Sequence, residues 1–356
     1  MTVLPLALLG QNTPRIAPVP ADPLELATGP IRVLSTSPDR DAALQLLIRA
    51  RSNYMLQGGG QAYDLRVGFT ANSLGRTNYD GSWEMEDQFV PGQGQRWTAK
   101  SAAGYMITGI STNGKLYGEG TSSAVPLRLQ EARGMLLDPL PGRAHATSGS
   151  IRTATAAFHG TTVTCVLLSS SRNTTFPSLG RGWEESEECI DPQSGLLMMH
   201  SQAPGNYAAY DYTNAPQFAG RTLPRSVTVT EAGSPVLKVN VESLEPLSST
   251  DPSLLVPTAA MSASGPATVM ATTTKLTRIH GQFPAGSAGM IRPVVVFGML
   301  TPTGQLVEVH SLQPGDPNSD AAVQDARSID FSPALRPGSR PQQHFVFVIE
   351  KFVGQQ

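Results

Sequence analysis

A run of short strands separated by turns fills the middle of the sequence, from residue 150 to residue 243. Apolar and polar residues alternate within these segments, which is the pattern of a strand with one buried face. The expected strands are 154–158, 163–168, 184–190, 196–200, 206–211, 225–230 and 237–241. Strands that follow one another through short turns form antiparallel sheets, and 34 glycines and 29 prolines suit such turns. The chain is therefore expected to be built mainly on antiparallel β-sheet.

The preceding part of the chain adds two helices around a second group of strands. Ser37-Pro-Asp-Arg-Asp41 combines a capping serine, a proline and acidic residues, which predicts a helix start, and Gly58-Gly-Gly60 ends that helix. Strands are expected at 63–69, 81–89, 96–101, 104–109 and 115–117, and a second helix at 125–137. The inner side of this second helix is expected to consist of Leu127, Leu129, Ala132 and Leu136.

The order of helix, strands, helix and long antiparallel run resembles the lipoprotein-carrier family typified by LolA. The residues that carry the resemblance are Gly81-Ser-Trp83-Glu84, Cys189–Leu197, Tyr210-Asp-Tyr212, Phe218–Arg221 and Leu223–Arg225. The resemblance covers Ile31 to Thr258 and implies an open antiparallel β-barrel, with two helices plugging the open side over a hydrophobic cavity. An ordinary barrel filled by its own side chains fits the same pattern.

The last part of the chain, from Met290 to Val353, reads as strand, turn, strand, short helix and final strand. This order resembles the C-terminal domain of TonB energy transducers. The residues that carry the likeness are Val294–Met299, Gly304, Leu306–His310, Ser319–Arg327, Phe331-Ser-Pro-Ala334, Gly338 and Phe345–Phe352. The sequence shows neither the N-terminal membrane helix nor the proline-rich rod of that family, so the resemblance implies docking of a partner rather than energy transduction.

Together these patterns predict an α+β protein: a lead-in or signal-peptide remnant at 1–30, a LolA-like open β-barrel at 31–260, a linker at 261–275 and a TonB-like domain at 276–356. The first ten residues have the apolarity of a signal-peptide core but lack the basic residues that precede one. They are either the remnant of a signal peptide that begins upstream or an unstructured tail. Export to the periplasm is the favoured interpretation.

The two cysteines bear on the compartment. Cys165 and Cys189 each lie in a strand-like run, and a cross-strand disulfide is possible if the two strands pair. The alternative is a pair of buried free thiols, because cysteine packs as a small hydrophobic residue. A disulfide would indicate an oxidising compartment.

Composition and motifs exclude several classes of function. The net charge of −2 gives no reason to expect binding of nucleic acid. The sequence has no apolar stretch of the roughly 20 residues that span a membrane. None of the six histidines has metal-ligand spacing, and no nucleophile-elbow, metalloprotease or phosphate-binding motif occurs. No enzyme activity, metal or cofactor is therefore expected.

Two groups of polar residues leave a catalytic interpretation open. The run Glu184-Glu185-Ser-Glu187-Glu188 would supply a carboxylate pair or a calcium site, but a solvated strand is the favoured interpretation. His159 and Asp211 would form a catalytic pair if the fold brought them together. The spacing of the two residues gives no support to such a pair, so an ordinary histidine of a sheet is the favoured interpretation of His159.

Two apolar groups are candidates for binding. Aromatic side chains would line an apolar pocket if they point inward, and otherwise form plain core: Phe69, Trp83, Trp97, Tyr207, Tyr210 and Tyr212. The final strand is apolar on both faces, which predicts a helix on one side and more protein on the other. Its edge would dock a partner, unless it is a fully paired central strand, through His344, Phe345, Val346, Phe347, Val348 and Ile349.

The sequence therefore favours a non-enzymatic protein of a bacterial cell envelope. The barrel is expected to bind an apolar ligand or a lipid-modified partner, and the C-terminal domain to dock an envelope protein such as an outer-membrane transporter. The alternative is an interaction module of a TonB-type transport system, with a solid barrel as spacer. A third possibility is a hydrolase that uses His159 or the glutamate run.

Overall fold

The structure is a computed structural model that describes residues 15–16, 32–34, 36–75, 77–121, 125–141, 149–169, 181–247, 251, 253–264, 274–280, 290–301, 304–331 and 344–353. Most of the described strands belong to one large sheet. They are β2 (Arg32–Val33), β3 (Tyr63–Ala71), β4 (Gly81–Val90), β5 (Gly94–Ser101), β6 (Met106–Thr112), β7 (Lys115–Gly120), β8 (Ser150–Phe158), β9 (Thr161–Ser169), β10 (Ser186–Ile190), β11 (Leu197–Ala203), β12 (Asn206–Asp211), β15 (Ser226–Glu231) and β16 (Ser234–Pro246). A small separate hairpin pairs β13 (Gln217–Phe218) with β14 (Arg221–Thr222).

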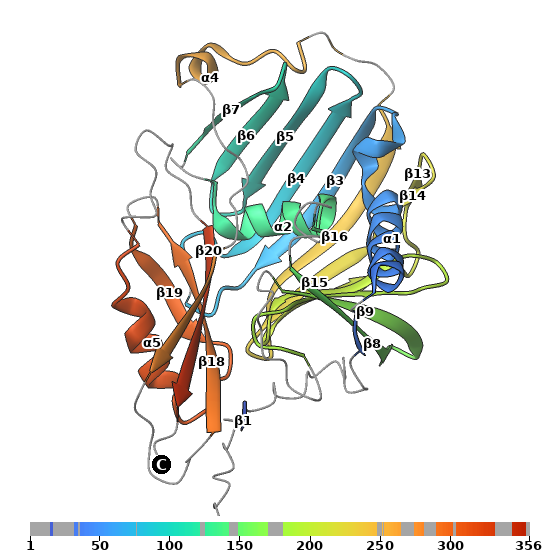
Figure 1. Cartoon of the computed structure of the whole chain (residues 1–356). Helices are drawn as coiled ribbons and strands as arrows, with labels where there is room; N and C mark the ends of the chain where they lie inside the picture. Colours follow the sequence, from blue (N-terminus) through green and yellow to red (C-terminus); the bar gives the residue numbers. More distant parts are fainter. Residues whose placement is uncertain are drawn as a thin grey trace, which may run out of the picture.

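The large sheet has 13 strands in the order β2-β8-β9-β10-β11-β12-β15-β16-β3-β4-β5-β6-β7, and it curves around a concave face (Figure 1). Neighbouring strands pair antiparallel throughout, for example Phe69 with Trp83 between β3 and β4. In the described part of the chain β2 and β7 are its two edges, so no strand pairing closes the sheet into a barrel. The prediction of an antiparallel sheet is confirmed.

Alternation along each strand decides which side chains face the helices. On β3 the buried positions are Tyr63, Leu65, Val67, Phe69 and Ala71, and the residues between them are less buried. Side chains of successive strand residues point to opposite faces, so this pattern places one apolar row on the concave side. The main hydrophobic core lies there.

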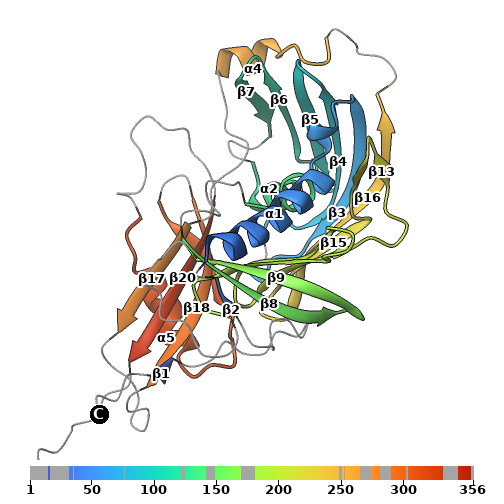
Figure 2. The same cartoon turned by 45° about the vertical axis from the view of Figure 1, so that its right-hand side comes forward.

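Two helices pack into the concave face (Figure 2). They are α1 (Ser37–Tyr54), which continues into the 3₁₀ turn η1 (Leu56–Gly59), and α2 (Leu127–Leu137). The cap of α1 differs from the prediction by one residue. Thr36 is the N-cap and its Oγ1 accepts a hydrogen bond from the backbone N–H of Asp39 at 3.4 Å, while Ser37 already belongs to the helix.

Helix α2 is buried on nearly all sides. The four predicted inner residues are buried, but so are Arg128, Gln130, Glu131 and Arg133. The predicted inner side of α2 is therefore confirmed, and the structure adds that most of its other side is buried as well. Phe297 of the C-terminal domain and Glu231 of β15 lie against Arg128 on this other side.

The C-terminal domain is a smaller sheet with one helix on it. Its strands are β1 (Arg15–Ile16), β17 (Thr274–His280), β18 (Met290–Leu300), β19 (Leu306–Ser311) and β20 (His344–Val353), and its helix is α5 (Ser319–Arg327). The order is β1-β18-β20-β17, and β19 also pairs with β18. Ala322 and Ala326 of α5 pack on one face of this sheet.

The other face of the small sheet packs against the large sheet. Phe297 and Phe347 contact Trp183, which precedes β10, and Ala203 at the end of β11. Gln313 donates a hydrogen bond to the backbone carbonyl of Pro204, and Lys351 pairs with Glu184. The prediction that the final strand has a helix on one side and more protein on the other is confirmed.

The prediction that the final strand offers a free edge for docking a partner was wrong, because strands pair with it on both sides. β20 lies between β18, with which it is antiparallel, and β17, with which it is parallel. Both backbone edges are therefore occupied along most of the strand, and residues 346–349 are buried within the protein. The alternative of a central strand is what the structure contains.

Segments outside the two sheets differ in detail from the predicted boundaries. Arg15 and Ile16, in the expected lead-in, pair with β18. The expected linker at 261–275 is partly structured, because α4 (Ala259–Ser264) extends into it and β17 begins at Thr274. Residues 265–273 lie outside the described part of the chain. Among the described helices, none combines the length and apolarity that a membrane crossing requires.

Candidate functional site

The six aromatic residues predicted to line a pocket do not gather at one site. Phe69, Trp83, Trp97 and Tyr210 belong to the main core between the helices and the sheet. Phe69 and Trp83 stack with ring centroids 5.7 Å apart, as expected for paired neighbours on β3 and β4. These side chains fill the core instead of lining the pockets described below.

The remaining two tyrosines lie at different places. Tyr212 packs partly against the main core, and its hydroxyl donates a hydrogen bond to the carbonyl of Leu197 at 2.9 Å. Tyr207 packs on the opposite face of the sheet, in the cluster that contains Cys165 and Cys189. Residues 207 and 210 are an odd number of positions apart on one strand, so the period of two already places them on opposite faces.

A pocket of about 300 Å³ does lie on the concave side, between η1, the end of α2 and the first residues of β3 and β5. Its walls are mostly apolar, and its lining residues are Met55, Leu56, Gln57, Tyr63, Gln95, Arg133, Gly134, Leu137 and Asp138. This volume is at the lower end of the range for ligand pockets. We call it the helix pocket.

Two further pockets adjoin the same helices. One of about 220 Å³ lies along the outer side of α1 and shares Met55 with the helix pocket. Another of about 170 Å³ lies on the other side of α2, against β20, and shares Gly134 and Asp138 with it. The region around α2 is therefore incompletely filled by side chains.

A buried polar group lies beneath the helix pocket. The Asp87 carboxylate accepts hydrogen bonds from the Tyr63 hydroxyl at 3.3 Å, from Gln95 at 2.6 Å and from Nη2 of Arg133 at 3.1 Å. The Arg133 guanidinium also lies 4.3 Å from the centre of the Trp97 ring. Burial raises the pKa of Asp87 and lowers that of Arg133, and each charge offsets part of this effect on the other.

The C-terminal half of α1 and the following η1 are fastened to the rest of the fold by hydrogen bonds to backbone carbonyls. Arg49 of α1 donates to Pro192 at 3.1 Å and to Gln193 at 2.5 Å, in the turn between β10 and β11. Arg221 of β14 donates to Gly58 of η1 at 3.0 Å. Arg221 and Gly58 also line the outer pocket on α1.

The two helices meet through few polar contacts. Arg51 of α1 pairs with Asp138 after α2 at 2.9 Å, and the Tyr54 hydroxyl donates to the carbonyl of Met135 at 2.8 Å. Arg51 and Asp138 are part-exposed, with 31% and 46% of their side-chain surface accessible. Exposed ion pairs of this kind contribute little to stability, so the pair of Arg51 and Asp138 holds α1 and the end of α2 together only weakly beside the helix pocket.

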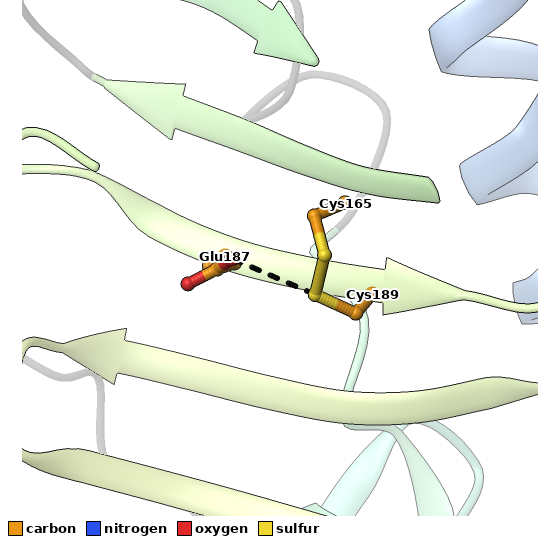
Figure 3. A group of neighbouring side chains, drawn as sticks. All are labelled: Cys165, Glu187 and Cys189. Atoms are coloured by element: carbon orange, nitrogen blue, oxygen red, sulfur yellow. Dashed lines mark hydrogen bonds between the residues drawn. A yellow bond between two sulfur atoms is a disulfide. The ribbon is translucent and has the colours of Figure 1, made fainter. Parts of the chain in front are cut away.

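The predicted disulfide is present. Cys165 of β9 and Cys189 of β10 are directly opposite each other in the ladder and their sulfurs are bonded (Figure 3). A Glu187 carboxylate oxygen lies 3.6 Å from Sγ of Cys189, and since a disulfide sulfur carries no proton, this is a contact without a hydrogen bond. These three side chains are of metal-ligand types and lie close together, but the disulfide engages both sulfurs.

The glutamate run is not the solvated strand that was expected. Glu185, Glu187 and Glu188 are all almost fully buried. Arg152 binds Glu185 with its Nε at 2.7 Å and Nη2 at 2.5 Å, and Arg181 lies 3.5 Å from Glu187. The prediction failed because it took charge as a sign of exposure, whereas Glu185 and Glu187 are buried with the arginines Arg152 and Arg181 as cationic partners.

The predicted pair of His159 and Asp211 lies on the surface. His159 occupies the turn between β8 and β9 with a φ of 46°, and both residues are exposed. The Asp211 carboxylate accepts a hydrogen bond from the backbone N–H of Thr213 at 2.9 Å, which lowers its pKa. His159 adds a smaller effect in the same direction, so the two residues are neighbours in an open setting without a bounded pocket.

A second buried ionic cluster, which no sequence pattern predicted, joins α2 to the C-terminal domain. Arg128 binds Glu231 through both its terminal nitrogens, at 2.9 and 3.0 Å, and Glu131 at 2.6 Å. Its guanidinium lies over the Phe297 ring, 5.6 Å from the centre. His310 of β19 approaches Glu231 to 3.3 Å, although its ring is not aligned as a hydrogen-bond donor.

This cluster separates the pKa values of two carboxyl groups. Burial raises the pKa of Glu131 to about 7, although Arg128 acts against this effect. Burial also acts to raise the pKa of Glu231, but Arg128 and His310 outweigh it and the result is about 2. Glu231 is therefore the carboxylate that balances Arg128, and Glu131 is the second, less compensated acid.

Comparison with known proteins finds similarity only at the level of structure. The sequence matches no protein-family model and no curated protein. A LolA superfamily protein from Nitrosomonas europaea has 9% identity and a TM-score of 0.38, and the match covers 60% of this chain and 96% of that one. A domain assigned to outer membrane lipoprotein sorting, from Vibrio parahaemolyticus, has 11% identity and a TM-score of 0.36, with 61% and 97% covered.

MucB, a third similar structure, has 11% identity and a TM-score of 0.29, with 62% of this chain and 64% of that one covered. It has also been solved as the Pseudomonas aeruginosa MucA/MucB complex. These structures include the LolA group that the N-terminal pattern resembles. All three TM-scores are below 0.5, so the function is argued from the residues of this chain.

Proposed function

We propose that this protein is a non-enzymatic binding protein of a bacterial cell envelope. It holds an apolar ligand, or the lipid chain of a modified partner, between α2, η1 and the concave face of the large sheet. The observation that carries this proposal is the helix pocket, a space of about 300 Å³ with apolar walls formed by Met55, Leu56 and Leu137. An apolar ligand there would remove further apolar surface from water.

The way the helices are held supports a site that opens. Beside the pocket, the polar contacts of the end of α1 and η1 are the hydrogen bond from Arg221 to the carbonyl of Gly58 and the part-exposed pair of Arg51 and Asp138. Such contacts are exchanged for water at small cost, whereas the apolar side of α1 stays packed on the sheet. A ligand larger than the present pocket would enter by displacing η1 and the end of α1.

Location in an oxidising compartment is part of the proposal and rests on the bonded cysteines. Cys165 and Cys189 form a buried disulfide, and such bonds persist in periplasmic and secreted proteins. Non-reducing mass analysis of protein purified from the native host is expected to find the bond intact. Recovery of two free thiols would argue against export.

A second candidate is an interaction module that docks a partner through a TonB-like C-terminal domain. One observation favours it: in the described residues β17 pairs with β20 on one side only, so its other edge offers unpaired backbone groups. The intact protein would then recover an envelope protein, such as an outer-membrane transporter, from a membrane extract. If the helix pocket also proves empty and closed to ligands, this candidate replaces the carrier.

The carrier proposal is tested on the protein as purified from its native envelope. Organic extraction followed by mass spectrometry is expected to release an apolar compound in near-stoichiometric amount, and delipidated protein is expected to bind an environment-sensitive apolar dye. Heat-unfolded protein serves as the control for nonspecific adsorption. Absence of both an extracted compound and saturable dye binding would reject the proposal.

A further inference from the structure

A small pocket lies where the C-terminal domain meets α2. Its volume is about 170 Å³, close to the size of an engineered cavity that holds benzene. One wall is formed by Phe345 and Phe347 of β20, and the opposite wall by Leu127 and Met135 of α2. We call it the junction pocket. It is separate from the helix pocket, which lies beyond Gly134 on the other side of α2.

Two polar side chains of the junction pocket have hydrogen-bonding capacity that the described residues leave unused. Asn206, at the start of β12, is 4% exposed, and among the described residues its carboxamide has no hydrogen-bond partner. Glu131 is 6% exposed, and Arg128 contacts one of its carboxylate oxygens. The Asn206 carboxamide is not among the fully enclosed unpartnered groups of the described chain, so it reaches the space of the pocket, and a ligand that fills this space must complete its hydrogen bonds.

The charges around the pocket favour a cation. Arg128 is bound bidentately by Glu231, so this pair is already neutral and leaves Glu131 as a second carboxylate on the same guanidinium. Asp138 at the rim adds another acid, which Arg51 pairs with from α1.

Two histidines are also close to these acids. His200 pairs with Glu188 at 2.6 Å, and His310 lies 3.3 Å from Glu231. Each of them adds a positive charge only when protonated. Arg128 is the permanent cation that contacts both Glu131 and Glu231, so these two carboxylates outnumber the permanent positive charge between them.

We propose that the junction pocket binds a primary ammonium group on an alkyl stem, with the ammonium between Glu131 and Asn206 and the stem against Phe345 and Phe347. An ammonium group supplies three donors, which the Glu131 carboxylate and the Asn206 carbonyl oxygen can accept. Methylenes suit the aromatic wall, and aromatic rings also attract cations. This site is additional to the apolar ligand of the helix pocket.

Other ligand classes fit less well. A carboxylate or phosphate would lie against Glu131 and face like charge. A wholly apolar group would fill the space but leave the Asn206 carboxamide buried without a partner. A neutral alcohol would satisfy Asn206 and gain nothing from the charge of Glu131. Charge is therefore the property that the test must vary.

Binding of a cation would be linked to release of a proton. The pKa of Glu131 is raised to about 7, so the carboxyl group is partly protonated near neutral pH. An ammonium group prefers the ionised form, and its affinity should fall as the pH decreases below about 7.

The test is a calorimetric titration of the intact protein with n-butylammonium, n-butanol and butyrate as matched probes. We expect n-butylammonium to bind at least about tenfold more tightly than the other two at pH 8, and its affinity to decrease toward pH 5.5 with proton release on binding. Equal affinities for the three probes, or an affinity for n-butylammonium that does not depend on pH, would overturn the proposal.

Variants locate the binding in this pocket. Glu131→Gln keeps the shape of the side chain and is expected to weaken n-butylammonium binding about tenfold and remove the proton release, while Glu84→Gln on the exposed side of β4 changes neither. If Glu131→Gln fails to fold, Asn206→Ala and the pH dependence of the unaltered protein decide the matter. Undiminished binding in both pocket variants would contradict the assignment.

The source of the ammonium group is distinguished by two larger probes. Nα-acetyl-lysine methylamide represents a lysine side chain of a protein, and O-phosphoethanolamine represents a lipid headgroup. Binding of the first alone assigns the pocket to a protein partner, and binding of the second assigns it to an aminolipid. If neither binds although n-butylammonium does, the pocket is too narrow for any natural carrier of the group and the proposal fails.

Discussion

At the scale of single residues, this protein depends on carboxylates that are buried together with their cations. Arg152 of β8 and Glu185, just before β10, are both almost inaccessible, and they are more enclosed than the pairs of Glu187 and Glu188. Removal of one member leaves the other charge in a medium where it has little solvation. Glu185→Ala is therefore expected to lower the free energy of unfolding by about 3–5 kcal/mol in urea titrations.

The matched control for this substitution is Glu84→Ala. Glu84 pairs with Lys100 at 2.8 Å, but both side chains are more than half exposed. Exposed pairs stabilise little, so this variant should unfold at nearly the same urea concentration as the unaltered protein. Similar losses in both variants would show that burial does not govern the strength of these pairs.

Glu131 and Glu231 should make opposite contributions to the pH dependence of stability. The folded pKa of Glu131, about 7, exceeds its unfolded value, so its contribution is fully present below about pH 4.5 and is lost as the pH rises through 7. The folded pKa of Glu231, about 2, is depressed, so its contribution is present above about pH 4.5 and is lost toward pH 2.

Unfolding measured across this range in single glutamine variants tests both signs. Relative to the unaltered protein, Glu131→Gln should become more stable as the pH rises from about 5 to 8. Glu231→Gln should instead lose relative stability as the pH rises from about 2 to 5. Parallel curves for the two variants would contradict the assignment of the pKa values within this cluster.

The sequence identified apolar residues better than charged ones. Positions such as Leu129, Leu136 and Phe347 are buried as their spacing predicts, because local periodicity records which face of an element is apolar. Arg128 and Arg133 were missed, because their partners Glu231 and Asp87 lie far away in the sequence. Only the fold brings such pairs together, and so the composition of the candidate site was not predictable.

At the scale of elements, the tether between α1 and the turn after β10 is a sensitive point. Gly195 in this turn has a φ of 74°, and a Cβ there would lie 2.8 Å from Nε of Arg49. Glycine is therefore required both by the backbone conformation and by the close approach of the helix. Arg49 in turn contributes two hydrogen bonds to carbonyls of the turn.

Arg49→Ala is expected to loosen α1 without unfolding the sheet. Loss of these hydrogen bonds should cost roughly 1 kcal/mol, which corresponds to about fivefold faster amide hydrogen exchange in α1. Gln45→Ala, an exposed position on the same helix, is the control and should leave exchange unchanged or slower. Equal exchange of α1 in both variants would show that the turn does not hold the helix.

Element positions were predictable, and element contacts were not. Strands such as β4 and β12 lie within one residue of their predicted ranges, because alternation and turn residues are local signals. The number of neighbours of a strand is a property of the whole sheet. For this reason the final strand was taken as a possible docking edge, although β18 and β17 flank it on both sides.

At the scale of the whole molecule, the two sheets should behave as one cooperative unit. Phe297, Phe347 and Trp183 form a shared apolar cluster, and Arg128 links α2 to both sides of the junction. Hydrogen exchange of β18 and β20 is expected to require the same opening free energy as that of β3 and β4. Exchange of the C-terminal strands through a separate, cheaper opening would show that the domains are independent.

The helix pocket is proposed to bind an apolar ligand, and a larger side chain that fills the pocket should therefore prevent the binding. Leu137 lines the pocket, so Leu137→Trp should occupy part of its volume, whereas Leu74→Trp adds the same ring at an exposed position. Fluorescence titration with a long-chain acyl probe should show saturable binding to the unaltered protein and to Leu74→Trp, and at least about tenfold weaker binding to Leu137→Trp. Equal affinity of all three proteins for the probe would contradict the claim.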